Sequence, residues 1–366
     1  MVATLKSGWL TSGPRVKAFE EEFSKLKGNV PTVAVNSCTA GIFLALKSLG
    51  FEPGDEVITT PMSFVATANC VVHAGARVVF ADIDPVTMNI SPEEIERKFT
   101  KRTKAILPVH IGGNPCEMDR IMALANEHGL EVVEDCAHAI EGEFEGKPLG
   151  TFGYAGSFSF YPTKNITSAE GGMITCRDEK VRHMLSVLSR HGLDKGTYQR
   201  MEVEGRPLYD VMMPGFKANM TDLQAGIGLQ QMKKLHQMYD RRVEIHGKYL
   251  EAFSQLDTVR VIRQNPKGKP SLHLFLIILQ PDLLTISRDE FLQTARKRGV
   301  ELSVNYVPIH LFSWYRSQFC TVPGAYPEAE FAGANVVSLP FYPAMKDKDV
   351  DYVIETLTDI LKQNRL

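Results

Sequence analysis

Short apolar runs alternate with helical patterns along the first two-thirds of the chain. The runs that predict strands are 33–36, 56–60, 77–81, 105–109, 130–134, 155–160 and 172–176. Between them, apolar residues recur at helical spacing in 37–49, 65–74 and 117–129, which predicts helices with one buried face. Strands that alternate with helices predict an α/β fold with a mostly parallel central sheet and helices on both faces.

The last third of the chain has a different pattern. A long helical pattern runs from Thr221, a plausible N-cap, to about residue 256. A strand is then predicted at 272–279, and helices at 287–298 and 348–363. We therefore expect a large domain over residues 1–230 and a smaller α+β domain over 231–366, joined by the helix at 221–256.

Composition excludes several classes of protein. The 41 Lys and Arg residues nearly balance the 43 Asp and Glu residues, so no bulk charge favours nucleic acid or an anionic membrane surface. No apolar stretch approaches the ~20 residues that span a bilayer, and the N-terminus has no secretory pattern. The six cysteines lack C-x-x-C spacing, so we expect neither a metal site nor disulfides, and a cytoplasmic setting.

The most informative chemistry lies around Lys164, in a segment of small and aromatic residues that ends at Gly172. Taken alone, Lys164 would be read as an ordinary solvated lysine. However, pyridoxal phosphate enzymes need a lysine that forms a Schiff base, and a carboxylate that faces the pyridine nitrogen. Asp135 follows the strand at 130–134, where a carboxylate is costly without a cationic partner. A protonated pyridine nitrogen is such a partner, so the two residues together favour a cofactor site.

The segment 36–41 follows the first strand, at the sheet edge where open parallel sheets carry their ligands. The helix N-terminus and the Thr39 hydroxyl offer donors for a phosphate, although Ser37 can also be read as a simple N-cap. Neither a Walker loop nor a G-x-G-x-x-G segment follows any strand, so a nicotinamide-type site is disfavoured. His138 lies close enough to Asp135 in sequence to contact the same ring, although a lone histidine is more often structural.

These residues resemble the sugar-nucleotide aminotransferases of the DegT/StrS family, within the fold-type I pyridoxal phosphate-dependent transferases. The matching stretches follow the family's order through nearly the whole chain. They are 5–14, 36–40, 61–67, 134–139, 157–172, 190–192, 215–222 and 339–340 with 345. The resemblance implies a fold-type I architecture with pyridoxal 5′-phosphate as the cofactor.

The resemblance also implies roles for individual residues. Lys164 matches the lysine that binds the cofactor covalently, and Asp135 matches the partner of its pyridinium nitrogen. The other expected cofactor contacts are Phe64 and His138 at the ring, and Cys38 (through its backbone), Thr39 and Ser159 at the phosphate. Asn219 matches an asparagine that reaches the phosphate of a neighbouring subunit, which implies a homodimer with shared active sites. Tyr306 and His310 match a segment that approaches the sugar.

The implied reaction moves an amino group, with glutamate as the donor, to a nucleotide-linked keto-sugar for surface polysaccharide biosynthesis. The variants at 135–138 and 215–219 look closest to members that act at C4 of UDP-sugars, so we expect a UDP- or dTDP-linked 4-keto-6-deoxyhexose. A 3-keto-sugar aminotransferase remains an alternative, as does a non-catalytic regulatory protein that binds the cofactor. The family's dehydratase branch carries histidine in place of the lysine, and Lys164 argues against it.

Two further features concern substrate contacts. Arg190, Lys195 and Arg200 are candidates to meet the diphosphate, although an exposed basic stretch is more often simply solvated. The chain also begins almost at Ser7-Gly8-Trp9, whereas family members usually carry a further stretch before this segment. Any substrate or dimer contact from such a stretch lies outside this sequence, and the residues around Lys164 are unaffected.

Overall fold

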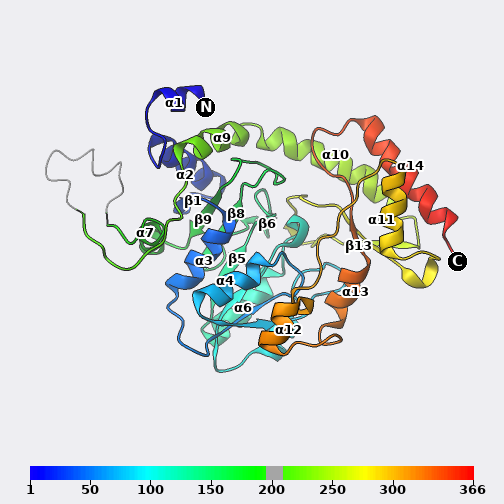
Figure 1. Cartoon of the computed structure of the whole chain (residues 1–366), viewed down its shortest axis with the longest axis horizontal. Helices are drawn as coiled ribbons and strands as arrows, with labels where there is room; N and C mark the ends of the chain where they lie inside the picture. Colours follow the sequence, from blue (N-terminus) through cyan, green and yellow to red (C-terminus); the bar gives the residue numbers. More distant parts are fainter. Residues whose placement is uncertain (195–208) are drawn as a thin grey trace.

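A seven-stranded sheet forms the centre of the computed structural model, which describes residues 1–194 and 209–366 (Figure 1). The strands, in spatial order, are β1 (Thr32–Val35), β9 (Gly172–Cys176), β8 (Ala155–Ser159), β5 (Glu131–Asp135), β4 (Thr103–Leu107), β2 (Glu56–Thr59) and β3 (Arg77–Phe80). β9 runs antiparallel to both of its neighbours, and every other pairing in the sheet is parallel. The mostly parallel sheet expected from the sequence is therefore confirmed.

Helices cover both faces of this sheet because neighbouring strand residues point to opposite sides. Val57 and Val133 face a core shared with α3 (Cys38–Ser48), α4 (Ala66–Ala74) and α7 (Glu179–Leu188). Ile58 and Val132, one position away on the same strands, face a second core. That core is shared with α2 (Pro14–Leu26), α5 (Pro92–Lys98), α6 (Met118–His128) and α9 (Asp222–Met232). Burial on both faces explains why these strands read as continuous apolar runs.

A smaller antiparallel sheet lies near the C-terminal helix. Its strands, in order, are β10 (Val259–Val261), β12 (Leu276–Leu279) and β13 (Val336–Ser338). A third core packs this sheet against α10 (Leu235–Phe253), α11 (Arg288–Lys297) and α14 (Asp347–Gln363). The other helices of this part are α12 (Ser313–Phe319) and α13 (Pro327–Asn335). The mixture matches the expected α+β character, and the domain boundary at residue 230 stays a prediction.

The single helix expected at 221–256 is wrong in one respect, because the chain forms two helices there. Thr221 does cap the first one in a capping box with Gln224, as its sequence position predicted. The break at residues 233–234 separates α9, which packs on α2, from α10, which packs on α14. The strand expected at 272–279 is likewise shorter, because the backbone at 271–274 bonds to Gly112 and Gly113 instead.

Short elements complete the described ranges. They are α1 (Val2–Lys6), a three-stranded ribbon of β11 (Gly268–Lys269), β6 (Glu143–Phe144) and β7 (Lys147–Pro148), and three 3-10 helices, η1 (Ile111–Gly113), η2 (Pro281–Leu283) and η3 (Ile309–Leu311). Within residues 1–194 and 209–366, no helix has both the length and the apolar character to cross a membrane. The cysteines are free thiols, and Cys320 is the exposed one.

Asp222 connects α2 and α9, two helices that are far apart in sequence and pack on the central sheet. Its buried carboxylate accepts the backbone N–H of Gly13 at 2.8 Å, of Val16 at 3.0 Å and of Arg15 at 3.1 Å. These donors form the N-terminus of α2, whose own N-cap residue supplies no side-chain bond. A residue at the start of α9 therefore caps α2.

We expect Asp222→Ala to lower the free energy of unfolding by about 3 kcal/mol, because three buried N–H groups lose a charged acceptor. Urea unfolding measures this change. The matched control is Asp178→Ala, which removes a hydrogen bond to the N–H of Val181 at the start of α7 and an exposed ion pair with Arg177. It should cost about 1 kcal/mol. Equal losses in the two variants would contradict the capping role of Asp222.

Candidate active site

The predicted cofactor residues gather where the parallel strands end. Cys38 opens the helix after β1, and Phe64 lies between β2 and α4. Asp135 is the last residue of β5, Ser159 is the last residue of β8, and Lys164 lies in the loop from β8 to β9 (Figure 1). In an open parallel sheet this edge is where ligands bind. The fold thus brings together residues that are up to 126 positions apart in sequence, from Cys38 to Lys164.

Asp135 is a buried carboxylate held by neutral donors. Its Oδ2 accepts the hydroxyl of Thr67 at 2.8 Å, and its Oδ1 accepts the N–H of Ala137 at 3.1 Å. Burial raises the pKa of Asp135, and the Thr67 bond is the strongest effect that opposes this rise. A nearby cation would therefore stabilise the ionised form further.

Lys164 is half-buried and lies within electrostatic range of this carboxylate. Burial lowers the pKa of its amine, whereas the proximity of Cys38 and Asp135 acts in the opposite direction. Its backbone N–H is bonded to the carbonyl of Tyr161 at 2.9 Å, which shapes the loop. A lowered pKa makes the neutral amine more accessible, and the neutral amine is the form that attacks a carbonyl.

His138 is held in one tautomer. Its Nδ1 accepts the N–H of Gly112 at 3.2 Å, so a neutral ring carries its hydrogen on Nε2. Nε2 lies 3.1 Å from the hydroxyl of Tyr306, which therefore accepts this hydrogen and directs its own elsewhere. Burial holds the pKa of His138 well below its usual value, and the charge of Lys164 adds to this effect. The ring is neutral and fixed.

Sequence reasoning missed the residues that support His138 and the lysine loop. The ring of His273 packs against His138 with centroids 4.4 Å apart, and its Nδ1 donates to Oδ1 of Asn165 at 3.0 Å. Asn165 in turn donates to Glu141 and to the carbonyl of Ser271, both at 2.8 Å. One signal was available, since His273 is the only polar residue in the apolar run 272–279.

The loop after β1 forms a helix N-terminus. The hydroxyl of Ser37 accepts the N–H of Ala40 at 3.1 Å, so Ser37 is the N-cap of α3. This arrangement leaves the first-turn N–H groups of Cys38 and Thr39 without intrahelical partners, as at any helix start. Gly172 packs directly on this turn, and a Cβ there would lie 2.6 Å from the backbone nitrogen of Cys38. The close approach requires glycine.

The remaining predicted residues, Phe64, His310 and Asn219, differ in exposure and in contacts. Phe64 is 60% exposed and lies 6.2 Å, centroid to centroid, from the ring of Tyr306, so its face is free to stack on a ligand. His310, in contrast, is fully buried, where Nε2 bonds to Glu330 at 3.0 Å. Its described ring contacts are with Phe80 and Tyr326, and its predicted approach to the sugar stays a prediction. Asn219 forms a bridge with β1 and donates to Ser12 at 2.7 Å, and its predicted contact with another subunit stays a prediction.

The basic candidates for diphosphate contacts are only partly described. Arg190 lies just beyond α7, where its guanidinium donates to the carbonyl of Ser186 at 3.1 Å and to its hydroxyl at 2.8 Å. Lys195 and Arg200 lie outside the described residues. The expected contacts of this segment therefore stay predictions.

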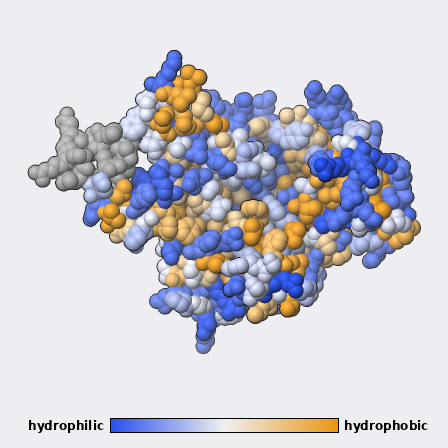
Figure 2. All heavy atoms as spheres, viewed as in Figure 1, coloured by the Kyte–Doolittle hydropathy of each residue, from blue (hydrophilic) through white to orange (hydrophobic). Residues whose placement is uncertain are grey.

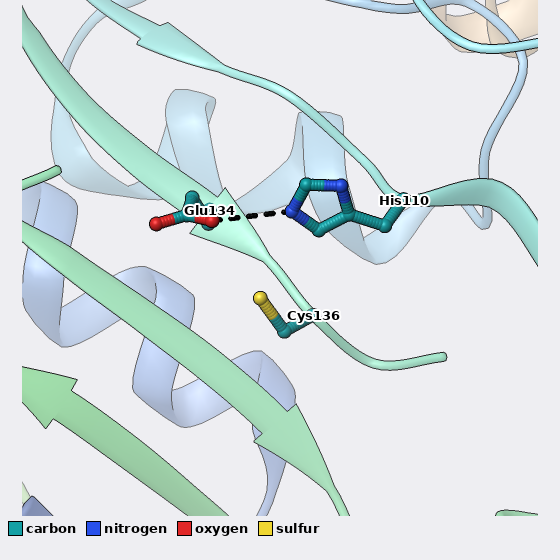
Figure 3. A group of neighbouring side chains, drawn as sticks. All are labelled: His110, Glu134 and Cys136. Atoms are coloured by element: carbon teal, nitrogen blue, oxygen red, sulfur yellow. Dashed lines mark hydrogen bonds and ion pairs between the residues drawn. The ribbon is translucent and has the colours of Figure 1, made fainter. Parts of the chain in front are cut away.

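A buried group is formed by His110, Glu134 and Cys136. The atoms of these side chains that could bind a metal ion lie within 4.8 Å of one another (Figure 3). Oε2 of Glu134 accepts the N–H of Gly150 at 2.8 Å, Oε1 accepts another N–H of the same loop, and His110 Nε2 lies 3.2 Å away. Nδ1 of His110 accepts the N–H of Cys116, so Nε2 carries the hydrogen shared with Glu134. Burial raises the pKa of the Cys136 thiol well above its usual value. We interpret the group as a hydrogen-bonded anchor for two loops.

The donors at this edge fit pyridoxal phosphate. The helix N-terminus at Cys38 and Thr39 suits a phosphate, and the buried carboxylate of Asp135 suits a protonated ring nitrogen. The exposed ring of Phe64 and the fixed ring of His138 are available to flank an aromatic ligand. Lys164 supplies the amine.

Comparisons with known proteins agree with this site. Residues 1–358 match the profile of the DegT/DnrJ/EryC1/StrS aminotransferase family. The chain is 45% identical over 365 residues to the spore coat polysaccharide biosynthesis protein SpsC of Bacillus subtilis, covering 98% of this chain and 92% of that protein.

Solved structures give the same result. The putative sugar aminotransferase Spr1654 of Streptococcus pneumoniae, in its PMP form, superposes with a TM-score of 0.93 at 31% identity, over 99% of this chain and 95% of that one. PseC of Helicobacter pylori, an aminotransferase involved in the biosynthesis of pseudoaminic acid, gives 0.92 at 28% identity with the same coverage.

Glu141 should make stability depend on pH. Burial raises its pKa from 4.5 to about 7, so the folded protein holds a proton that the unfolded chain has already lost between these values. The free energy of unfolding should therefore fall as pH rises from about 4.5 to about 7, by up to about 1.4 kcal/mol per pH unit. Glu141→Gln keeps an acceptor for Asn165 and should flatten this slope.

Urea unfolding at pH 5, 6 and 7 measures the slope. Glu20, whose pKa burial also raises to about 7, contributes in the same window, so adding Glu20→Gln should flatten it further. An unchanged slope in the single Glu141→Gln variant would show that Glu141 is ionised in the folded protein throughout this range.

Proposed function

The chain belongs to the DegT/DnrJ/EryC1/StrS aminotransferase family, and we propose that it transfers an amino group from glutamate to a nucleotide-linked keto-sugar. The favoured acceptor is a UDP- or dTDP-linked 4-keto-6-deoxyhexose, aminated at C4. The family and its structural neighbours are pyridoxal phosphate-dependent sugar aminotransferases. The observation that carries the proposal is a buried carboxylate, Asp135, that is bonded by Thr67 and Ala137 at the end of β5. The amine of Lys164 lies within electrostatic range of this carboxylate, and the His138 ring is held by Gly112 and Tyr306.

Each site residue has a definite part in this proposal. When bound, pyridoxal phosphate carries the amino group between the two substrates and withdraws electrons from the reacting carbon. Asp135 holds the proton on its ring nitrogen, and Phe64 and His138 keep the ring in one plane. The N-terminus of α3, the Thr39 hydroxyl and Ser159 hold the phosphate.

Lys164 is the acid and base of the reaction. It would hold the cofactor covalently, and its free amine would accept and return the proton of the donor's α-carbon. Burial lowers its pKa, which favours the neutral base needed to accept that proton. The hydroxyl of Tyr306, whose oxygen is occupied by His138, has its hydrogen free to donate to the sugar.

Several observations favour a large acceptor. Phe64 and Tyr161 are 60% and 48% exposed, which indicates a site open enough for a nucleotide. The names of SpsC and Spr1654 point to polysaccharide biosynthesis and to sugar substrates, and we propose the same setting for this chain. Two alternatives are amination at C3 and a non-catalytic regulatory protein that binds the cofactor.

We further propose that the enzyme acts as a homodimer with shared active sites. The helix α1 presents Met1, Val2 and Leu5, each more than half exposed, and Figure 2 shows an apolar patch at this end of the molecule. Such a patch suits a subunit contact. The phosphate contact predicted for Asn219 would need its Nδ2 as the donor, and within one subunit Nδ2 bonds to the hydroxyl of Ser12 at 2.7 Å and to the carbonyl of Met220 at 3.3 Å.

Lys164→Ala should reduce transamination to below about 1% of wild type, because no other residue supplies both the covalent link and the proton transfer. Circular dichroism should show an unchanged fold. Lys180→Ala, which removes an exposed lysine on α7, is the matched control and should keep full activity. Borohydride reduction and peptide mapping should label Lys164, and a label on a different lysine would refute the assignment.

The acceptor is tested with glutamate and a panel of 3-keto and 4-keto nucleotide sugars, with the position of the new amine located by NMR. We expect amination at C4 of a UDP- or dTDP-sugar. Amination at C3 would favour the first alternative. Without any acceptor, glutamate should release about one equivalent of 2-oxoglutarate per site, and no release would favour the regulatory protein.

A further inference from the structure

Two buried hydroxyls line up behind Asp135. Oγ of Ser63 lies 2.8 Å from Oγ1 of Thr67, which lies 2.8 Å from Oδ2 of Asp135. All three residues are at most 4% exposed. Neither hydroxyl belongs to the cofactor contacts described above. Thr67 lies in the first turn of α4, and Ser63 lies just before that helix.

The direction of these bonds follows from the charge on Asp135. An ionised carboxylate only accepts, so the single hydrogen of the Thr67 hydroxyl must point to Asp135. Thr67 then has no hydrogen left for Ser63, and Ser63 must donate to Thr67. The chain Ser63→Thr67→Asp135 is consistent in this order, and each bond polarises the next.

The chain bears on where a proton rests. Asp135 and the ring nitrogen of the bound cofactor share one proton, which can lie on either atom. A donor to Asp135 stabilises its carboxylate and not its neutral acid, so it shifts the proton towards the ring. A protonated ring withdraws electrons better than a neutral one, so the position of this proton affects the rate.

We propose that Thr67, oriented by Ser63, is a positioning residue that keeps Asp135 ionised and the proton on the cofactor's ring nitrogen. The proposal rests on the proposed function, since it takes the ring nitrogen to face Asp135. Ser63 and Thr67 act through Asp135 and do not touch the reacting atoms.

Other groups also act on Asp135 and must be held constant in the test. The titratable groups whose charges interact with it are Lys164, His110, Cys38, Cys70, Cys136 and Tyr306. None of them forms a described hydrogen bond with its carboxylate. Substitutions at Thr67 and Ser63 leave all of them in place.

The first test loads the full-length protein with 15N-labelled pyridoxal phosphate and reads the ring nitrogen by NMR. Thr67→Val removes the hydroxyl and nearly keeps the shape of the side chain, whereas Thr67→Ser keeps the hydroxyl. We expect a protonated ring in wild type and in Thr67→Ser, and a shift towards the neutral value in Thr67→Val. A ring that stays protonated in Thr67→Val would overturn the proposal.

The second test separates this role from simple packing. In Thr67→Val, kcat should fall about tenfold or more while KM for glutamate changes less than about twofold, since only the charge balance is altered. Thr67→Ser should restore kcat to within about threefold. Equal losses in both variants would indicate that the methyl group matters, and this result also overturns the proposal.

Ser63→Ala keeps the test decisive should Thr67→Val not fold. It removes the donor to Thr67 and should raise the pKa of Asp135, read by 13C NMR of labelled aspartate in the cofactor-free protein. An unchanged pKa overturns the proposed role of Ser63 and Thr67.

The two proposals fail separately. A protonated ring without sugar amination would refute only the proposed function. A sugar aminotransferase that is insensitive to substitution of Thr67 would refute only the role of Thr67.

Discussion

The structure depends on two adjacent carboxylates that are buried at the end of β5. Glu134 and Asp135 point to opposite sides of the strand, and neither has a lysine or arginine within hydrogen-bond distance among the described residues. A buried carboxylate is tolerated only when its oxygens accept hydrogen bonds. The chain therefore has to bring donors to this point, and several loops are shaped by that requirement.

The two carboxylates have different roles. Glu134 collects backbone N–H groups from the loop at 150–153 and the ring of His110, so it holds the scaffold together. Asp135 is bound by one hydroxyl and one N–H, which leaves acceptor capacity for a ligand. One strand end thus supplies both a structural anchor and a chemical group, because successive side chains face opposite ways.

The segment at 271–274 connects the smaller sheet to this site. Its backbone bonds to Gly112 and Gly113, and Ser271 bonds to both Glu141 and Asn165. On its other side, the buried guanidinium of Arg242 donates to the carbonyls of Leu272 and His273. The smaller sheet is therefore part of the support for Lys164 and His138, and the site needs the C-terminal third of the chain to be in place.

Periodicity and residue type by themselves determined the α/β class and the strands of the central sheet, and they predicted that Lys164 and Asp135 serve one cofactor site. These features are local, since burial of a strand on both faces leaves a continuous apolar run, and an isolated carboxylate at its end needs a partner. Only the tertiary structure decided which neutral groups contact Asp135 and His138. Thr67, Gly112 and His273 reach the site from three separate segments. A hydroxyl or a glycine has no distinctive pattern in sequence, and His273, although it interrupts an apolar run, does not reveal from that run which ring it contacts. The split of the 221–256 helix and the burial of His310 were decided in the same way, because both follow from which partners pack against them in space.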